Sequence, residues 1–205
     1  MELPMFPLGS VLFPGTAVPL QVFEPRYRAL TAWCLENDPR LGVVLIERGS
    51  EVGGGDVRFA VGTQARLAEA VALPDGRWLI AVAGERRARV RRWLAEEPFP
   101  RAEVELLDDR PPLAGHPAAR DAIVAKVHRA LALKVALGEW HPEVAEPALA
   151  PDPVLAGWQA AAVGVLGPAD CQRVLEADDV GARLALVASL LDEQIELLSL
   201  RAGRQ

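Results

Sequence analysis

The stretch LPMFPLGSVLFPGTAVPLQVFEPRY, residues 3–27, decides the fold, because it sets five prolines among strongly apolar side chains. A proline lacks the N–H that a strand ladder needs and holds φ at about −65°, so prolines at this density confine the chain to short extended segments, edges and turns. We expect two short strands, at residues 5–8 and 17–23. A turn through Phe13, Pro14 and Gly15 joins them, since Gly15 can adopt a positive φ.

A helix is expected to begin directly after the second strand and to reach about residue 37. Pro25 suits the first helical position, and Glu24 places a carboxylate beside the positive end of the helix dipole. The apolar positions that follow are spaced i, i+3 and i+7 and therefore form one buried stripe: Tyr27, Leu30 and Cys34.

The chain between this helix and residue 107 has the pattern of β-strands. An apolar, β-branched run at residues 41–47 indicates a strand that is covered on both faces. The sequence PDG at residues 74–76 predicts the turn of a hairpin, whose returning strand carries Gly84 at an expected bulge. A last strand is expected at residues 99–107.

The composition changes after residue 108, where a polar, proline-rich segment indicates a connection between two structural regions. Helices are expected at residues 117–137, 153–166, 168–177 and 179–201. The last helix has an apolar stripe wide enough for two neighbouring helices, which predicts a small bundle. The stripe consists of Val180, Leu184, Leu186, Val187, Leu190, Leu191, Ile195, Leu197 and Leu198. The fold class is therefore α+β, with a β-rich region at residues 1–112 and a helical region at residues 113–205.

Composition and charge exclude several classes of function. The chain has 205 residues and a net charge of −6, so it offers no broad basic face to a nucleic acid. No apolar run reaches the roughly 18 residues that a membrane span needs, and no secretory signal begins the chain, so we expect a cytoplasmic protein without a membrane partner. Cys34 and Cys171 are far apart in sequence and outside any C-x-x-C pattern, which indicates reduced thiols.

The sequence predicts no catalytic, cofactor or metal site. Neither G-x-x-x-x-G-K-[ST] nor G-x-G-x-x-G is present, so no nucleotide is implied. His116, His128 and His141 have no second ligand at a spacing that metal sites use. Ser189 and Cys34 are the nucleophiles to consider, but no activating base accompanies either of them.

The strongest charge feature is RRARVRR at residues 86–92. Its arginines alternate across both faces of a strand, which fits a solvated face paired with local acids or contact with an acidic partner. Trp93 follows on one of these faces, and Trp140 follows a helix end, so both are candidates for interface anchors, although packing between the two halves explains them equally well. The candidate protein-binding residues are Trp93, Trp140, Arg87, Arg89, Arg91 and Phe99.

Three blocks of sequence, which together span nearly the whole chain, carry a family resemblance. They are FPLGSVLFPGTAVPLQVFEPRY at residues 6–27, the elements VGT, GR and GERR that begin at residues 61, 76 and 84, and QRVLEADDVGARLALVASLLDEQIE at residues 172–196. In these blocks the chain resembles the N-terminal, substrate-binding domain of the ATP-dependent Lon protease. The residues that carry the first block are expected to form a structural motif: Phe6, Pro7, Phe13, Pro14, Gly15, Phe23, Glu24, Arg26 and Tyr27.

The resemblance implies a pseudo-barrel of strands with one packed helix, followed by a helical bundle. In Lon an ATPase module and a Ser-Lys protease domain follow this region, whereas this chain ends at Gln205, so we expect the recognition module without motor or protease. The expected function is non-catalytic binding of unfolded or degradation-prone polypeptide, or of another protein partner, without a cofactor. Two alternatives are a small-ligand pocket at the junction of barrel and bundle and a stand-alone peptidase that uses Ser189 or Cys34.

Overall fold

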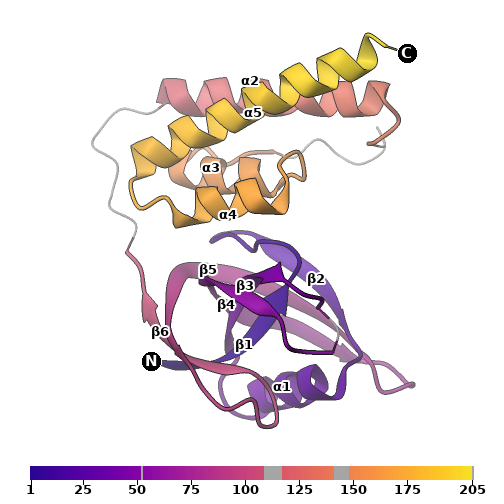
Figure 1. Cartoon of the computed structure of the whole chain (residues 1–205), viewed down its shortest axis with the longest axis vertical. Coiled ribbons are helices and arrows are strands. Elements are labelled where there is room, and N and C mark those ends of the chain that lie inside the picture. Colours follow the sequence, from indigo (N-terminus) through magenta and orange to yellow (C-terminus); the bar gives the residue numbers. More distant parts are fainter. Residues whose placement is uncertain (52, 109–116, 141–147, 205) are drawn as a thin grey trace. The chain divides into compact units, whose positions relative to one another are not determined.

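The computed structural model describes residues 1–51, 53–108, 117–140 and 148–204 of the chain (Figure 1). The chain divides into two units, Met1–Asp108 (unit 1) and Asp109–Gln205 (unit 2), and each is described by itself. The boundary expected at residues 112–113 lies outside the described residues and stays a prediction.

Unit 1 is built on a six-stranded sheet that packs against helix α1. Its elements are β1 (Glu2–Leu8), β2 (Ala17–Val22), α1 (Pro25–Glu36), β3 (Arg40–Arg48), β4 (Val57–Ala72), β5 (Trp78–Trp93) and β6 (Arg101–Leu106). The strand order is β2-β5-β4-β3-β1-β6, and β6 also pairs with β5, so the sheet closes on itself. β1 and β3 are parallel, whereas the other neighbouring pairs are antiparallel. With the helices of unit 2, this architecture confirms the predicted α+β class.

Prolines are tolerated in this sheet because they occupy edge positions. Pro4 and Pro7 lie in β1, where β6 pairs with residues 2–4 and β3 pairs with residues 5–8, so each half of the strand has a single ladder partner. Pro19 lies in β2, which pairs with β5 alone among the described strands. A missing N–H costs little at such positions, as the sequence predicted. The first strand nevertheless begins at Glu2, earlier than expected, because β6 extends its pairing.

Side chains of β1 alternate between two apolar clusters, since successive residues of a strand point to opposite faces. Leu3 and Met5 belong to one cluster and Phe6 and Leu8 to the other. The first cluster also contains Val44, Ala88, Ala102 and Val104. The second adds the stripe of α1, with Leu12, Val22, Tyr27, Leu30, Cys34, Leu41, Val43, Ala65, Leu67, Ile80, Val82 and Phe99. Both clusters are built from unit 1 alone, so this unit has a complete core.

The hairpin between β4 and β5 contains both predicted features, a glycine turn and a bulge. Gly76 has a φ of +82° and donates its N–H to the carbonyl of Leu73 at 2.9 Å. Gly84 pairs with Ala65, whereas Gln64 pairs with Arg86, so Glu85 is an extra residue in β5. A Cβ on Gly84 would lie 2.2 Å from the carbonyl oxygen of Phe13, which explains why a glycine stands there.

The bulge reverses the alternation of side chains along β5. Ile80, Val82 and Gly84 are buried, and after the extra residue the next buried position is Arg87, which is 1% exposed. The expectation that Arg87 lies on a solvated strand face is therefore wrong. A single inserted residue has moved it to the opposite face of the strand.

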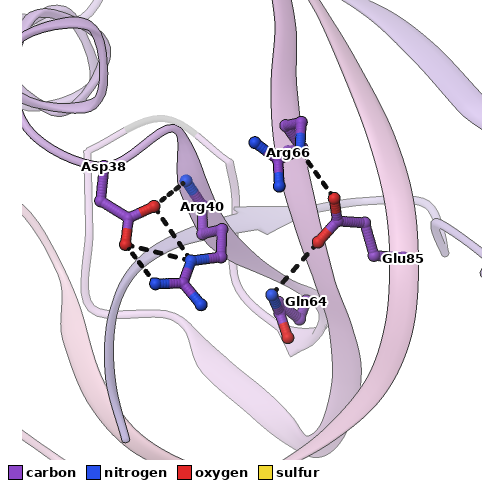
Figure 2. A network of polar contacts seen from close by, with 5 residues as sticks. All are labelled: Asp38, Arg40, Gln64, Arg66 and Glu85. Carbon is purple, nitrogen blue, oxygen red and sulfur yellow. Dashed lines mark hydrogen bonds and ion pairs between the residues drawn. The ribbon is translucent and has the colours of Figure 1, made fainter.

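Polar contacts hold the bulge in place (Figure 2). The Glu85 carboxylate reaches across to β4, where Gln64 Nε2 donates to it at 3.2 Å and Arg66 Nε at 2.8 Å. Beside them Arg40 of β3 forms an ion pair at 2.6 Å with Asp38, which precedes that strand (Figure 2). The hydrogen bond from Arg40 keeps the pKa of Asp38 below its ordinary value. These surface charges thus have local partners.

The described part of unit 2 is helical, with α2 (Pro117–Ala136), α3 (Pro153–Ala162), α4 (Pro168–Glu176) and α5 (Val180–Ala202). α2 and α5 pack along each other, and α3 contacts both, while α4 contacts α3 and α5. Gly138, at a φ of +72°, follows the end of α2 as predicted. α3 ends at Ala162, before the expected residue 166, because Gly164 adopts a φ of +85°. No helix in the described residues is both long and apolar enough to span a bilayer.

The last helix, α5, begins at a capped residue and buries most of its predicted stripe. The Asp179 carboxylate accepts a hydrogen bond from the N–H of Ala182 at 2.8 Å. Leu191 is fully buried, but Leu197 is 53% exposed, so the prediction that Leu197 widens the buried stripe is wrong. The buried members are Val180, Leu184, Val187, Leu190, Leu191, Ile195 and Leu198.

Candidate functional site

An exposed apolar surface covers the outward face of β2, β5 and β4. Cross-strand pairing sets Gln21 opposite Leu79 and Leu79 opposite Val71, which places their side chains in one row. Leu79 is 47% exposed and Val71 57%, and Phe23, which continues the alternation of β2, is 53% exposed. We call this surface the three-strand face and define it by Pro19, Gln21, Phe23, Glu69, Val71, Leu79 and Ala81; the exposed Glu69, opposite Ala81, is its one charged member. Apolar side chains gathered at a surface in this way are typical of interaction sites.

A cavity of about 200 Å³ adjoins this face at Phe23. The end of β1, the second half of β2 and the first turn of α1 form its walls, so the cavity is built from the stretch at residues 3–27 together with Glu51. The sequence identified this stretch as a structural motif, and the structure adds a hollow within it. The lining residues are Phe6, Pro7, Leu8, Pro19, Leu20, Gln21, Val22, Phe23, Glu24, Tyr27 and Glu51.

Charged groups at the cavity tie the start of α1 to the loop that precedes β4. Arg26 pairs with Glu24 at 3.2 Å and donates to the carbonyl of Glu51 at 3.0 Å. The Glu24 carboxylate also accepts from the N–H of Gly53 at 3.3 Å instead of capping α1. The Glu51 carboxylate accepts from the N–H of Gly9. Both acids of the cavity therefore hold the loop in place.

Tyr27 is the buried polar residue of this cavity. Its ring stacks on Phe6 with the centroids 4.3 Å apart, and the Arg26 guanidinium lies 4.4 Å from its centroid. The hydroxyl is buried and has no hydrogen-bond partner among the described residues. Burial raises the pKa of Tyr27 to about 12. The hydroxyl therefore stays protonated and can act as a hydrogen-bond donor.

Trp93, the first predicted anchor, lines a second, open hollow of about 520 Å³. Arg58 lies over its ring, with Cζ 4.5 Å from the centroid, and is in turn paired with Asp56 and, at 2.8 Å, with Glu96. The sequence placed Trp93 beside the arginines of its own strand. Arg58 was missed because it comes from β4, and no local pattern links it to Trp93.

The other predicted binding residues differ in exposure and belong to both units. Arg89 is half-buried. Arg91 is exposed and forms an ion pair with Glu105 of β6, as expected for a solvated arginine paired with an acid, although this acid comes from another strand. Phe99 precedes β6 and is 4% exposed, with its ring centroid 6.1 Å from that of Trp33. Trp140 is half-buried and belongs to unit 2. Phe99, like Arg87, is therefore a core side chain.

The possible nucleophiles lie in unfavourable surroundings. Burial raises the pKa of Cys34 to about 12 and that of Cys171 to about 11, so both thiols are protonated at neutral pH. Lys126 pairs with Asp192, and Lys134 donates to the carbonyl of Gly164 at 2.8 Å.

Metal ligands do not gather in the described part of the chain, where His, Cys, Asp and Glu side chains form no group suited to an ion. His128 lies on the surface of α2. The other two histidines of the sequence analysis, His116 and His141, lie outside the described residues.

Comparison with known proteins gives one consistent family. Residues 2–193 match the model of the ATP-dependent protease La (LON) substrate-binding domain. The Lon protease of Cytophaga hutchinsonii is 27% identical over 209 residues, which are 97% of this chain and 25% of that protein, and Lon protease 2 of Myxococcus xanthus is 32% identical over 97% of this chain and 24% of its own length. The chain thus spans about a quarter of the length of the curated relatives it matches.

Solved structures agree with this match. The Lon N-terminal domain protein from Xanthomonas campestris has a TM-score of 0.66 and 27% identity, over 92% of this chain and 98% of that one. The N-terminal domain of Mycobacterium avium complex Lon protease has a TM-score of 0.64 over 94% of this chain and 98% of its own, and at 18% identity it supports the fold alone. The resemblance read from the sequence is confirmed.

Proposed function

The chain belongs to the family of the ATP-dependent protease La (LON) substrate-binding domain, and from this membership we propose that it binds polypeptide segments that expose apolar side chains. The observation that supports this proposal is the three-strand face, where Phe23, Val71 and Leu79 are each about half exposed. Unfolded chains offer the apolar side chains that such a face can cover, and covering them removes apolar surface from water.

The mode of binding follows from the edge strand. β2 is where a peptide could add as a further strand, but Pro19 removes an N–H from this strand. Side-chain contacts on the face therefore supply the affinity, and backbone pairing contributes little. Such contacts depend on apolar area and not on a fixed sequence, which suits a recognition module for many substrates.

We also propose that this binding is not accompanied by catalysis by the chain itself. The family match is to the substrate-binding domain, and both cysteines are buried with raised pKa values. The two lysines bond to Asp192 and to Gly164. These observations support a binding role over a Ser-Lys or cysteine peptidase.

The test is the affinity for labelled casein, an unfolded polypeptide, measured by fluorescence anisotropy. Val71 and Leu79 are exposed, so the double substitution Val71→Ser and Leu79→Ser should preserve folding while it removes the apolar row. We expect binding to weaken about tenfold, which corresponds to about 1.4 kcal/mol. Leu197→Ser, at a leucine of α5 that is 53% exposed, is the matched control and should bind like the wild type.

Two results would count against the proposal as stated. If casein does not bind the wild-type chain, the proposed function is wrong. Equal binding by the wild type and the double variant, with loss in Trp93→Ala, would move the site to the hollow around Trp93 and Arg58.

A further inference from the structure

Helix α5 carries a second apolar pattern, on its exposed side. Leu197 and Leu200 are 53% and 56% exposed, and at a spacing of three residues they are neighbours on the helix surface. Glu193 precedes this pair by four residues and Arg204 follows it by four, and both are exposed. We call Glu193, Leu197, Leu200 and Arg204 the α5 seam.

The seam has the spacing of a coiled-coil contact. Its members are separated by four, three and four residues, the intervals between the a and d positions of a heptad, which pack against one further helix. Arg204 stays in this register although α5 ends at Ala202, because Gly203 keeps a helical conformation with φ −74° and ψ −4°. The buried residues Leu191 and Ile195 lie on the opposite side of the helix, so the packing within unit 2 leaves the seam uncovered.

The charges of the seam favour a second copy of the chain, in the antiparallel direction. Along the chain the seam reads acid, leucine, leucine, base, so its reverse is the complement of itself. In an antiparallel pair, a positions meet d positions, and Leu197 of one copy packs on Leu200 of the other. Glu193 of each copy then lies opposite Arg204 of the other. A parallel pair would instead place glutamate against glutamate and arginine against arginine, which repel each other.

We propose that the full chain forms an antiparallel dimer through the α5 seam. The seam offers far fewer residues than the roughly 20–30 a side of a standard interface, so the dimer is weak, with a dissociation constant on the order of 100 µM.

Two further charges flank the seam. Arg201 on one side is paired with Glu139 of its own chain, whereas Glu196 on the other side comes near its own copy in the second chain and limits the affinity. The inference is independent of the proposed function, since the seam belongs to unit 2 and the three-strand face to unit 1.

The first experiment is sedimentation equilibrium of the full chain at concentrations up to about 1 mM, roughly ten times the expected constant. The average mass should rise from 22.1 kDa by more than half as the concentration increases. Leu197→Ser with Leu200→Ser should weaken association at least tenfold, because it removes the apolar centre of the seam. Val71→Ser with Leu79→Ser, on the three-strand face, is the matched control and should associate like the wild type.

The second experiment tests the direction of the two helices by exchanging charges. Glu193→Arg alone and Arg204→Glu alone should each weaken association about threefold to tenfold, since each change turns two attractive pairs of the dimer into repulsive ones. The chain with both changes has its acid and base exchanged, so antiparallel copies match again. Its dissociation constant should return to within about twofold of the wild type. Circular dichroism of each variant checks that the helices are intact.

Three outcomes would overturn the inference. The first is a mass that stays at 22.1 kDa over the whole concentration range. The second is equal association by the wild type and the double leucine variant, or loss of association in the Val71 and Leu79 control, which would move the contact away from α5. The third is a failure of the exchanged charges to restore association, which would exclude the antiparallel seam. Leu197→Ser remains the control for casein binding when that assay is run well below the dissociation constant of the dimer.

Discussion

In the described part of the chain, three arginines lie face-on against aromatic rings. Arg26 covers Tyr27 at 4.4 Å, Arg58 covers Trp93 at 4.5 Å, and in unit 2 the buried Arg183 covers Trp158 at 3.8 Å. A planar guanidinium can stack on a ring and bond carboxylates at its edge, which an ammonium group cannot do in the same geometry. The high arginine content of this chain thus has a structural use at these positions.

The two thiols lead to a prediction about reactivity and alkaline stability. With pKa values of about 12 for Cys34 and about 11 for Cys171, at pH 8 roughly one thiol in a thousand or fewer is ionised. We expect slow labelling by 5,5′-dithiobis(2-nitrobenzoic acid) in the native protein and fast labelling in urea, measured by absorbance. Rapid labelling of the native chain would contradict the burial of both cysteines.

The raised pKa values of the two thiols also set the direction in which stability changes with pH. Folding favours the neutral thiols, so their contribution to stability is complete below the ordinary thiol pKa of 9.0 and is lost as the pH rises through about 11 to 12. Urea midpoints should therefore fall between pH 9 and pH 12. The variant Cys34→Ser with Cys171→Ser should show a weaker decline over this window, although Tyr27 still contributes.

Among the elements, the glycine bulge in β5 and the divided pairing of β1 have the largest consequences. The bulge at Glu85 changes which side chains face inward and buries Arg87. The pairing of β1 with β6 at one half and β3 at the other lets prolines stand inside a closed sheet. The bulge arises at a single residue and changes the facing of the strand beyond it.

Helix α5 offers a matched pair of leucines for a stability prediction. Leu191 is fully buried and Leu197 is 53% exposed, although both belong to the same apolar pattern in sequence. Leu191→Ala should lower the free energy of unfolding by about 2–5 kcal/mol through lost burial and a cavity. Leu197→Ala should change it by less than about 0.5 kcal/mol. Urea denaturation followed by circular dichroism measures both, and equal effects would contradict the placement of α5.

At the scale of the whole molecule, each unit has its own internal packing. The apolar clusters of unit 1 draw on residues from Leu3 to Val104, and the helices of unit 2 contact one another. Because the three-strand face lies within unit 1, this unit should carry the polypeptide-binding activity by itself.

We therefore predict that residues 1–108, expressed alone, fold and bind casein. The expected result is a dispersed ¹H–¹⁵N spectrum and an affinity within about threefold of the full chain, since the three-strand face belongs entirely to this unit. The fragment with Val71→Ser and Leu79→Ser is the control for specific binding. A fragment that stays unfolded would show that unit 1 needs the rest of the chain.

The sequence by itself determined the features that depend on neighbouring residues. The density of prolines predicted strands at edge positions, and Pro25 predicted the start of α1. Gly76 predicted the hairpin turn, and Gly84 predicted the bulge. Helical periodicity predicted α5 and most of its buried side. These signals are local, because a proline, a positive φ or a period of 3.6 acts within a few residues.

Only the tertiary structure decided which side chains meet across the sheet. The closure of β6 onto β5, the burial of Arg87, the contact of Arg58 with Trp93 and the cavity beside Phe23 join residues that are distant in sequence. A one-residue bulge exchanges the two faces of a strand, and the order of the strands decides which rows of side chains become neighbours. No local sequence pattern therefore shows which side chains will meet. The stretch at residues 3–27 was recognisable as a motif, but its cavity exists only once β1, β2 and α1 have packed together.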